Sequence, residues 1–236
     1  MTTTATFSRY ADLPALIGLM EGDDKHDAAS HSTLDVLWVL YDRVLDVTPH
    51  TVEDPARDRF LLSKGHGPAA FYAVLAAKGF LDVPTLRRWT TFDSPLGHHP
   101  DRVLVPGVEI GSGSLGHGMP LGLGMALGLR AQGIRRADGT APRVVVLVGD
   151  GELDEGSNHE TIAAAGRLGV DNLTVVVIDN ASASHGWPGG VGRRFEIEGW
   201  WVREVSGRDH EALHEAFTPA RTGGPSVVVA RVRNGS

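Results

Sequence analysis

The 236-residue sequence contains no cysteine, which excludes disulfides, thiolate metal sites and cysteine nucleophiles. It also lacks a basic run: 22 Lys and Arg against 29 Asp and Glu give a net charge of −7, so the electrostatic footprint of a nucleic-acid-binding protein is missing. No apolar stretch approaches the length of a membrane span, and the first ten residues lack the apolar segment of a secretory signal. We therefore expect a cytoplasmic protein that binds neither nucleic acid nor a membrane.

What the chain does contain is the composition of an ordinary soluble domain, with 42% apolar and 22% charged residues. Its length favours one large domain, over residues 1–236, with a substantial core. Glycine is unusually abundant, with 30 residues, many of them clustered. Such clusters indicate that the backbone approaches something closely at a few sites.

Apolar periodicity predicts alternating helices and strands. Helices are expected at 12–22, 33–46, 67–79, 83–90, 114–132, 155–168 and 209–217, and strands at 144–148, 173–178, 200–205 and 226–232. Residues 91–112, rich in Pro, His and Gly, are expected to form a loop. The apolar runs Val144–Val148 and Leu173–Ile178, separated by one helix, are typical of strands buried in a parallel sheet. The predicted fold class is therefore α/β: a doubly wound, mostly parallel sheet with helices on both faces, whose ligands bind at the carboxyl ends of the strands.

Polar side chains follow the two apolar strands. Asp150 comes after the first and Asn180 after the second, 180 − 150 = 30 residues later, which is about one strand–helix–strand unit. A carboxylate and an amide oxygen at one sheet edge form an oxygen-only site that suits Mg²⁺, an ion that shares its coordination shell with phosphate oxygens and water. Glycines beside Asp150 let a diphosphate approach backbone N–H groups, and the next helix adds the positive end of its dipole. Gly-Asp-Gly by itself would be only a common strand-to-helix turn.

Four short segments, taken in their order along the chain, resemble the thiamine-diphosphate motif of transketolases: Gly149-Asp150-Gly151, Glu155-Gly156, Asp171-Asn172-Leu173 and Asp179-Asn180. The resemblance implies that Asp150, Asn180 and the backbone carbonyl of Ser182 bind the Mg²⁺ of thiamine diphosphate. It also implies that the Gly151 N–H contacts the diphosphate and that Asn180 belongs to the cofactor site.

Further segments resemble transketolases in the order that the family has them. Leu62-Ser63-Lys64-Gly65-His66 looks like the Ser-Lys-Gly-His motif, which implies that His66 reaches the diphosphate. Residues 106–109, followed by 113–118, look like the loop that lies against the pyrimidine ring of the cofactor. This likeness implies that Gly113 and Leu115 contact the cofactor. The matches extend over about residues 15–205, most of the chain.

Two histidines fall where the family has residues that face the substrate. These are His99, in a His-Pro pair, and His26. The resemblance implies that both orient the substrate. The chain departs from the family here, because His98 stands where Gly is usual and residues 25–30 read Lys-His-Asp-Ala-Ala-Ser instead of Gly-His-Pro-Gly-Gly-Ser. These departures leave the identity of the substrate open.

The resemblance also implies what the chain lacks. Thiamine diphosphate is activated by a glutamate beside its pyrimidine ring, and the family carries this glutamate on a second domain. A full family chain has three domains, and the present sequence ends where the first would finish. We therefore expect a partner, a C-terminal transketolase subunit that carries the pyrimidine-binding domain and the activating glutamate, in an α₂β₂ heterotetramer.

The predicted function follows from these motifs. We expect the N-terminal subunit of a split, Mg²⁺-dependent transketolase, a transferase that moves a two-carbon ketol unit from a ketose (phosphate) to an aldehyde-type or specialised acceptor. Two alternatives stay open: a component of an enzyme similar to deoxyxylulose phosphate synthase, and a non-catalytic scaffold or regulatory subunit. The Ser-Lys-Gly-His segment favours transketolase over the first. The retention of Asp150 and Asn180 at matching strand ends argues against the second.

Overall fold

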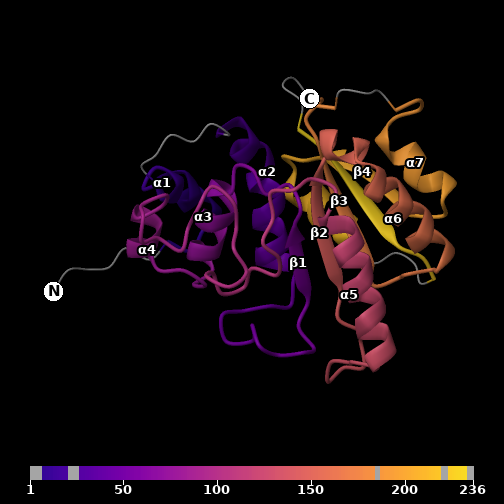
Figure 1. Cartoon of the computed structure of the whole chain (residues 1–236), viewed down its shortest axis with the longest axis horizontal. Helices are drawn as coiled ribbons and strands as arrows, with labels where there is room; N and C mark the ends of the chain where they lie inside the picture. Colours follow the sequence, from indigo (N-terminus) through magenta and orange to yellow (C-terminus); the bar gives the residue numbers. More distant parts are fainter. Residues whose placement is uncertain (1–6, 21–26, 184–186, 219–222, 233–236) are drawn as a thin grey trace.

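The computed structural model describes residues 7–20, 27–183, 187–218 and 223–232 (Figure 1). Within these ranges the chain forms a five-stranded sheet in the order β1-β2-β3-β5-β4, and every neighbouring pair of strands is parallel. The strands are β1 (Arg59–Leu62), β2 (Val144–Gly149), β3 (Leu173–Asp179), β4 (Trp201–Ser206) and β5 (Ser226–Arg231). The predicted α/β class with a parallel sheet is confirmed.

Helices cover both faces of the sheet. Successive residues of a strand point to opposite faces, so apolar side chains of the strands stand on both faces and form a separate core with the helices on each side. The helices are α1 (Leu13–Ile17), α2 (Asp27–Val39), α3 (Ala69–Ala77), α4 (Val83–Arg87), α5 (Gly118–Gln132), α6 (Gly156–Arg167), α7 (Val191–Ile197) and α8 (His210–Phe217), with 3-10 turns η1 (Tyr10–Asp12) and η3 (Gly151–Asp154) and a π-helical segment η2 (Leu40–Val44). Helices α1, α2, α3 and α8 share one core with the sheet, and α5, α6 and α7 share the other. No helix in the described part of the chain is both long enough and apolar enough to cross a bilayer.

The two central strands give the sheet a rigid middle. β2 is buried along its whole length, and β3 is buried at all but one position. Each fully buried Val, Leu or Ile side chain contributes about 1.5–3 kcal/mol relative to an exposed one. Polar groups at the carboxyl ends of these strands are therefore anchored on segments that are buried almost throughout.

Several elements differ from the sequence prediction. The short strand β1 and the helix α7 were not predicted, and helix α5 begins at Gly118 instead of residue 114. The later start has a clear cause, because Gly113 and Gly116 have φ values of +133° and +83°, outside the helical region. Helix α2 begins earlier and ends earlier than expected and continues into η2. Residues 91–112 form no helix or strand, as predicted.

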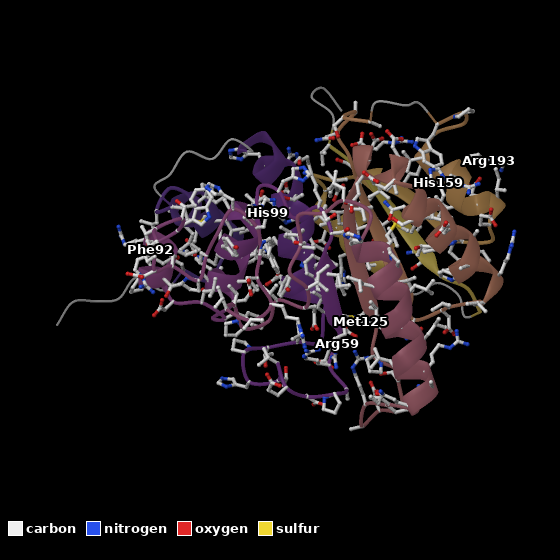
Figure 2. All side chains as sticks on the ribbon, viewed as in Figure 1. Arg59, Phe92, His99, Met125, His159 and Arg193 are labelled. Atoms are coloured by element: carbon white, nitrogen blue, oxygen red, sulfur yellow. The ribbon has the colours of Figure 1, made fainter. Side chains whose placement is uncertain are left out.

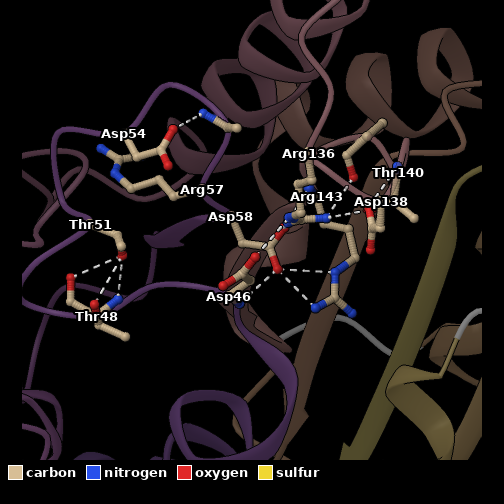
Figure 3. Close-up of polar contacts among 12 residues, drawn as sticks. Asp46, Thr48, Thr51, Asp54, Arg57, Asp58, Arg136, Asp138, Thr140 and Arg143 are labelled. Carbon is tan, nitrogen blue, oxygen red and sulfur yellow. Dashed lines mark hydrogen bonds and ion pairs between the residues drawn. The ribbon is translucent and has the colours of Figure 1, made fainter.

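A buried carboxylate links the segments that enter β1 and β2 at the amino ends of these strands (Figure 3). The Asp58 side chain is fully buried just before β1 and accepts hydrogen bonds from the Asp46 N–H at 3.0 Å and the Arg143 N–H at 2.6 Å. Its oxygens also pair with the guanidinium groups of Arg136 and Arg143. One carboxylate thereby joins the segment before β1 to the loop that leads into β2.

Replacing Asp58 by Asn should destabilise the protein by about 3 kcal/mol, because breaking a buried ion pair leaves the remaining charges without a partner. The free energy of unfolding, measured by urea denaturation, checks this. Asp138→Ala is the matched control, since Asp138 lies in the loop of Arg136 and Arg143 but is exposed and hydrogen-bonded to its neighbour Thr140. The interpretation of Asp58 is wrong if the two variants lower stability equally.

Candidate functional site

The carboxyl ends of β2 and β3 bring two of the predicted metal residues to one edge of the sheet. In the parallel pairing Gly149 lies opposite Ile178, and the Asp150 N–H donates to the Ile178 carbonyl at 3.0 Å. Asp150 follows β2 directly and Asn180 follows β3 directly, so both stand at the carboxyl ends of these strands. These strand ends point toward the top of Figure 1. The strands are neighbours, as the sequence predicted.

Asp150 is held by a tight turn after β3. Its carboxylate is buried and accepts hydrogen bonds from the Ser182 N–H at 2.8 Å, the Ser182 hydroxyl at 2.5 Å and the Gly151 N–H at 2.9 Å. The turn depends on Ala181, whose φ of +61° lies in the left-handed region. A non-glycine residue in this conformation costs on the order of 1–3 kcal/mol and persists where the surrounding structure requires it. The strained turn therefore folds Ser182 back onto Asp150.

Asn180, in the same turn, has an unusual side chain. Its Oδ1 atom is buried and has no hydrogen-bond partner in the described part of the chain. Such a buried acceptor costs about 1–3 kcal/mol, which a cation bound there would recover. The donor set is one carboxylate, one amide oxygen and the carbonyl of Ser182, and a Cβ on Gly151 would lie 3.4 Å from that carbonyl oxygen. Hard oxygen donors of this kind fit Mg²⁺.

The unpredicted strand β1 delivers the Ser63–His66 segment to the same edge. Lys64 is 5% exposed, passes beside Gly149, and donates from Nζ to the Ser32 hydroxyl at 3.1 Å. Burial lowers the pKa of Lys64 to about 8, while the carboxylates of Asp150 and Glu152 act in the opposite direction. His66 follows two residues later and is partly exposed. A cationic group and an imidazole thus follow β1 at the same edge of the sheet as the oxygen donors.

The loop 113–118 packs against this segment. A Cβ on Gly65 would lie 2.8 Å from the Gly113 N atom, and a Cβ on Gly113 would collide with the imidazole of His99. His99, in the loops beside α3 (Figure 2), is exposed and lies directly against the backbone of Gly113. Leu115 follows in the same loop and is partly exposed. The structure therefore brings together the segments that carry His66, Gly113, Leu115 and His99.

One predicted site residue, His26, lies outside the residues that the structure describes. A cavity of about 780 Å³ lies at the opposite edge of the sheet, where Trp201, Ser226 and Phe217 line it, and the residues that line it include none of the predicted site residues. The sequence analysis assigned no role to Lys64 or Glu152, although a charged residue directly beside a glycine, in Lys64-Gly65 and Gly151-Glu152, was a signal for both.

Comparison with known proteins agrees with this geometry. The sequence model of the family described as "Transketolase, thiamine diphosphate binding domain" matches residues 18–235. A protein of Actinobacillus succinogenes, named as one subunit of apulose-4-phosphate transketolase, is 33% identical over 218 residues, which are 89% of this chain and 77% of that protein. The transketolase of Leishmania mexicana, of known structure, superposes with a TM-score of 0.74 at 25% identity, over 95% of this chain and 37% of its own. The chain thus spans little more than a third of that transketolase.

A further relative is the protein of Rhodococcoides fascians named "Ferredoxin fas2", 55% identical over 223 residues, which are 94% of this chain and 72% of that protein. Iron–sulfur clusters are held by Cys thiolates, and this sequence has no cysteine, so the shared part carries no thiolate ligands here. Because the family model spans nearly all of the sequence, the chain belongs to the thiamine diphosphate binding domain family of the transketolases.

Proposed function

We propose that this chain is the N-terminal subunit of a split transketolase that depends on thiamine diphosphate and Mg²⁺ and transfers a two-carbon ketol unit from a ketose (phosphate) to an aldehyde-type acceptor. The observation that carries the proposal is the buried, unpartnered Oδ1 of Asn180, in the strained turn that folds Ser182 onto Asp150. A protein that served only as a scaffold would have no reason to keep this acceptor without a donor.

The chain's own residues would hold the phosphate end of the cofactor. Asp150, Asn180 and the Ser182 carbonyl would bind Mg²⁺, whose remaining positions suit phosphate oxygens and water. The Gly151 N–H, at the start of η3, would contact the diphosphate in addition to its hydrogen bond to Asp150, and His66 would donate to the diphosphate from its imidazole. When bound, thiamine diphosphate supplies a carbon nucleophile and an electron sink for breaking a carbon–carbon bond of the ketose.

The other predicted residues would position the reacting parts. Gly113 and Leu115 would contact the cofactor from the loop 113–118, with Gly113 kept close to His99. His99 is exposed at this edge, and together with His26 it would orient the substrate and polarise its oxygens by hydrogen bonding. These histidines act on the substrate and leave the activation of the cofactor to another group.

That other group would come from a partner. A C-terminal subunit with the pyrimidine-binding domain and the activating glutamate would complete the site, in an α₂β₂ assembly, while residues 1–236 form a single diphosphate-binding domain. Support comes from the Actinobacillus succinogenes relative, whose name makes it one subunit of a transketolase and of which this chain covers 77%.

Calorimetry tests the proposal. In the presence of a candidate partner chain, thiamine diphosphate should bind with a heat that disappears when EDTA removes Mg²⁺. Thiamine without phosphates should bind far more weakly, because the metal and the N–H donors act on the diphosphate. If thiamine diphosphate shows no Mg²⁺-dependent binding with any partner, the scaffold alternative is correct.

A further inference from the structure

A second buried carboxylate lies beside the proposed metal site. Glu152 is 2% exposed and stands two residues after Asp150, within η3. Its Oε1 accepts hydrogen bonds from the Ser63 hydroxyl and from the Gly116 N–H at 2.9 Å, and its Oε2 accepts from the Gly149 N–H at 3.4 Å. Burial raises the pKa of Glu152, and these three hydrogen bonds oppose that effect. The side chain therefore gathers donors from three separate segments.

Ser63 extends this network by one hydrogen bond. Its side chain, at the end of β1, is buried, and its hydroxyl donates to Glu152 while it accepts from the Gly118 N–H at 3.0 Å. The backbone carbonyl of Gly116 is bound in addition by the Ser157 hydroxyl at 2.6 Å. Two N–H groups and one carbonyl of the loop 113–118 are thus attached to side chains that follow β1 and β2.

The packing leaves this loop little freedom. A Cβ on Gly118 would collide with the Ser63 side chain, and a Cβ on Gly116 would lie 2.7 Å from the Glu155 Cβ. Gly116 also has a φ of +83°, which side-chain-bearing residues rarely adopt. The loop therefore packs closely against Glu155 at Gly116 and against Ser63 at Gly118. Hydrogen bonds to Glu152 and Ser63 hold it in this position relative to the sheet.

A carboxylate beside an anion-binding site needs an explanation, because like charges repel and a buried charge is costly unless it is compensated. Glu152 is compensated by its three donors and by buried Lys64, which the Asp150 and Glu152 carboxylates influence electrostatically. Its oxygens are turned to Ser63 and the two glycine N–H groups. The side chain is thus suited to hold backbone in place.

We propose that Glu152 and Ser63 are positioning residues that hold the loop 113–118, with Gly113 and Leu115, at a fixed place relative to Asp150 and His66. The proposal rests on the proposed function for its consequence, which is that this loop meets thiamine diphosphate. The ordering of the loop does not depend on the cofactor and can be measured in the chain by itself. Loop ordering and cofactor affinity are therefore measured in separate experiments.

Hydrogen exchange of the full chain without cofactor tests the ordering. In Glu152→Ala the amide of Gly116 loses its acceptor, so its exchange should be about tenfold faster or more. In Ser63→Ala the same should hold for the amide of Gly118. Glu152→Gln keeps one carbonyl oxygen for Ser63 and Gly116, so its exchange should fall between the wild type and Glu152→Ala.

Calorimetry with thiamine diphosphate, Mg²⁺ and the partner chain tests the consequence. Glu152→Ala should weaken cofactor binding about tenfold, because a loop that is no longer held in place must be ordered when the cofactor binds. Combining it with Ser63→Ala should add little, because both act in one network. Val227→Ala is the control for destabilisation, since Val227 is buried at the amino end of β5 and should lower thermal stability without changing affinity.

The outcomes separate the two proposals. If the wild type does not bind the cofactor, the proposed function fails, while hydrogen exchange still decides whether Glu152 orders the loop. If the wild type binds and Glu152→Ala leaves both exchange and affinity unchanged, the positioning role is wrong. Equal losses of affinity in Val227→Ala and Glu152→Ala would also overturn it. Should Glu152→Ala fail to fold, Glu152→Gln and Ser63→Ala carry the same test.

Discussion

Replacing Asp150 by Ala should abolish measurable Mg²⁺-dependent binding of thiamine diphosphate. Asp150 is the one carboxylate among the proposed metal ligands, and it organises the turn at Ser182 through both of its oxygens. The substitution therefore removes a charged ligand and also releases a second ligand, the Ser182 carbonyl. Loss of a group that only supports a ligand costs about 10–100-fold in affinity, so loss of the ligand itself should cost more.

The measurement is a calorimetric titration of thiamine diphosphate at saturating Mg²⁺, with the partner chain present. Asp150→Asn should retain part of the turn and bind weakly, because it keeps the shape of the side chain but loses the charge. Asp138→Ala is the matched control, since Asp138 is exposed in the loop at the amino end of β2 and should bind like the wild type. Unchanged affinity and metal dependence in Asp150→Ala would show that the metal binds elsewhere.

Without a partner chain the purified protein should show no ketol transfer above background, even with thiamine diphosphate and Mg²⁺. Activation of the cofactor requires a carboxylate beside the pyrimidine ring. The three buried carboxylates that end or follow β2 and β3 in the described part of the chain already have other partners, and Asp179, the last residue of β3, accepts from the Ala181 N–H at 3.3 Å. Asp150 is bound by Ser182 and Gly151, and Glu152 accepts from Ser63, Gly116 and Gly149. A positioned acid or base contributes about 10²–10⁴-fold to a rate.

A coupled assay with a ketose phosphate donor and an aldehyde acceptor measures this difference. Adding the C-terminal partner should raise the rate by about 10²–10⁴-fold, and a partner whose activating glutamate is replaced by Gln should restore little of it. Turnover by the isolated chain at the rate of the mixture would contradict the division of the active site between two subunits.

The position of the oxygen donors was predictable because it depends on local pattern. The apolar runs 144–148 and 173–178 are too continuous for surface strands, and a helix between them makes the strands parallel. Parallel strands end at the same edge, so Asp150 and Asn180 had to meet there. The structure confirms this placement, with Gly149 opposite Ile178. Their role as metal ligands stays a prediction until binding is measured.

The strand β1 was not predictable in the same way. It has four residues and begins with an arginine, so it carries too few apolar positions to stand out from the loop before it. Pairing with β2 makes it a strand, through a register that joins Arg59 to Val144, 85 positions later in the sequence. Without this pairing nothing places Lys64 beside Gly149.

Local sequence pattern was therefore enough for the α/β class, the parallel pair at the centre and the oxygen donors at the strand ends, because hydrophobic burial and strand polarity are read from neighbouring residues. The way in which the surrounding loops close on those donors depends on tertiary packing. Three features of the site depend on segments that meet only in the folded structure. They are the left-handed conformation of Ala181, the hydrogen bond from Ser63 to Glu152 and the contact of His99 with Gly113. The glycine clusters predict that the backbone comes close to something, but only the fold decides which distant segment it meets, because close packing and hydrogen bonding act between residues far apart in the sequence.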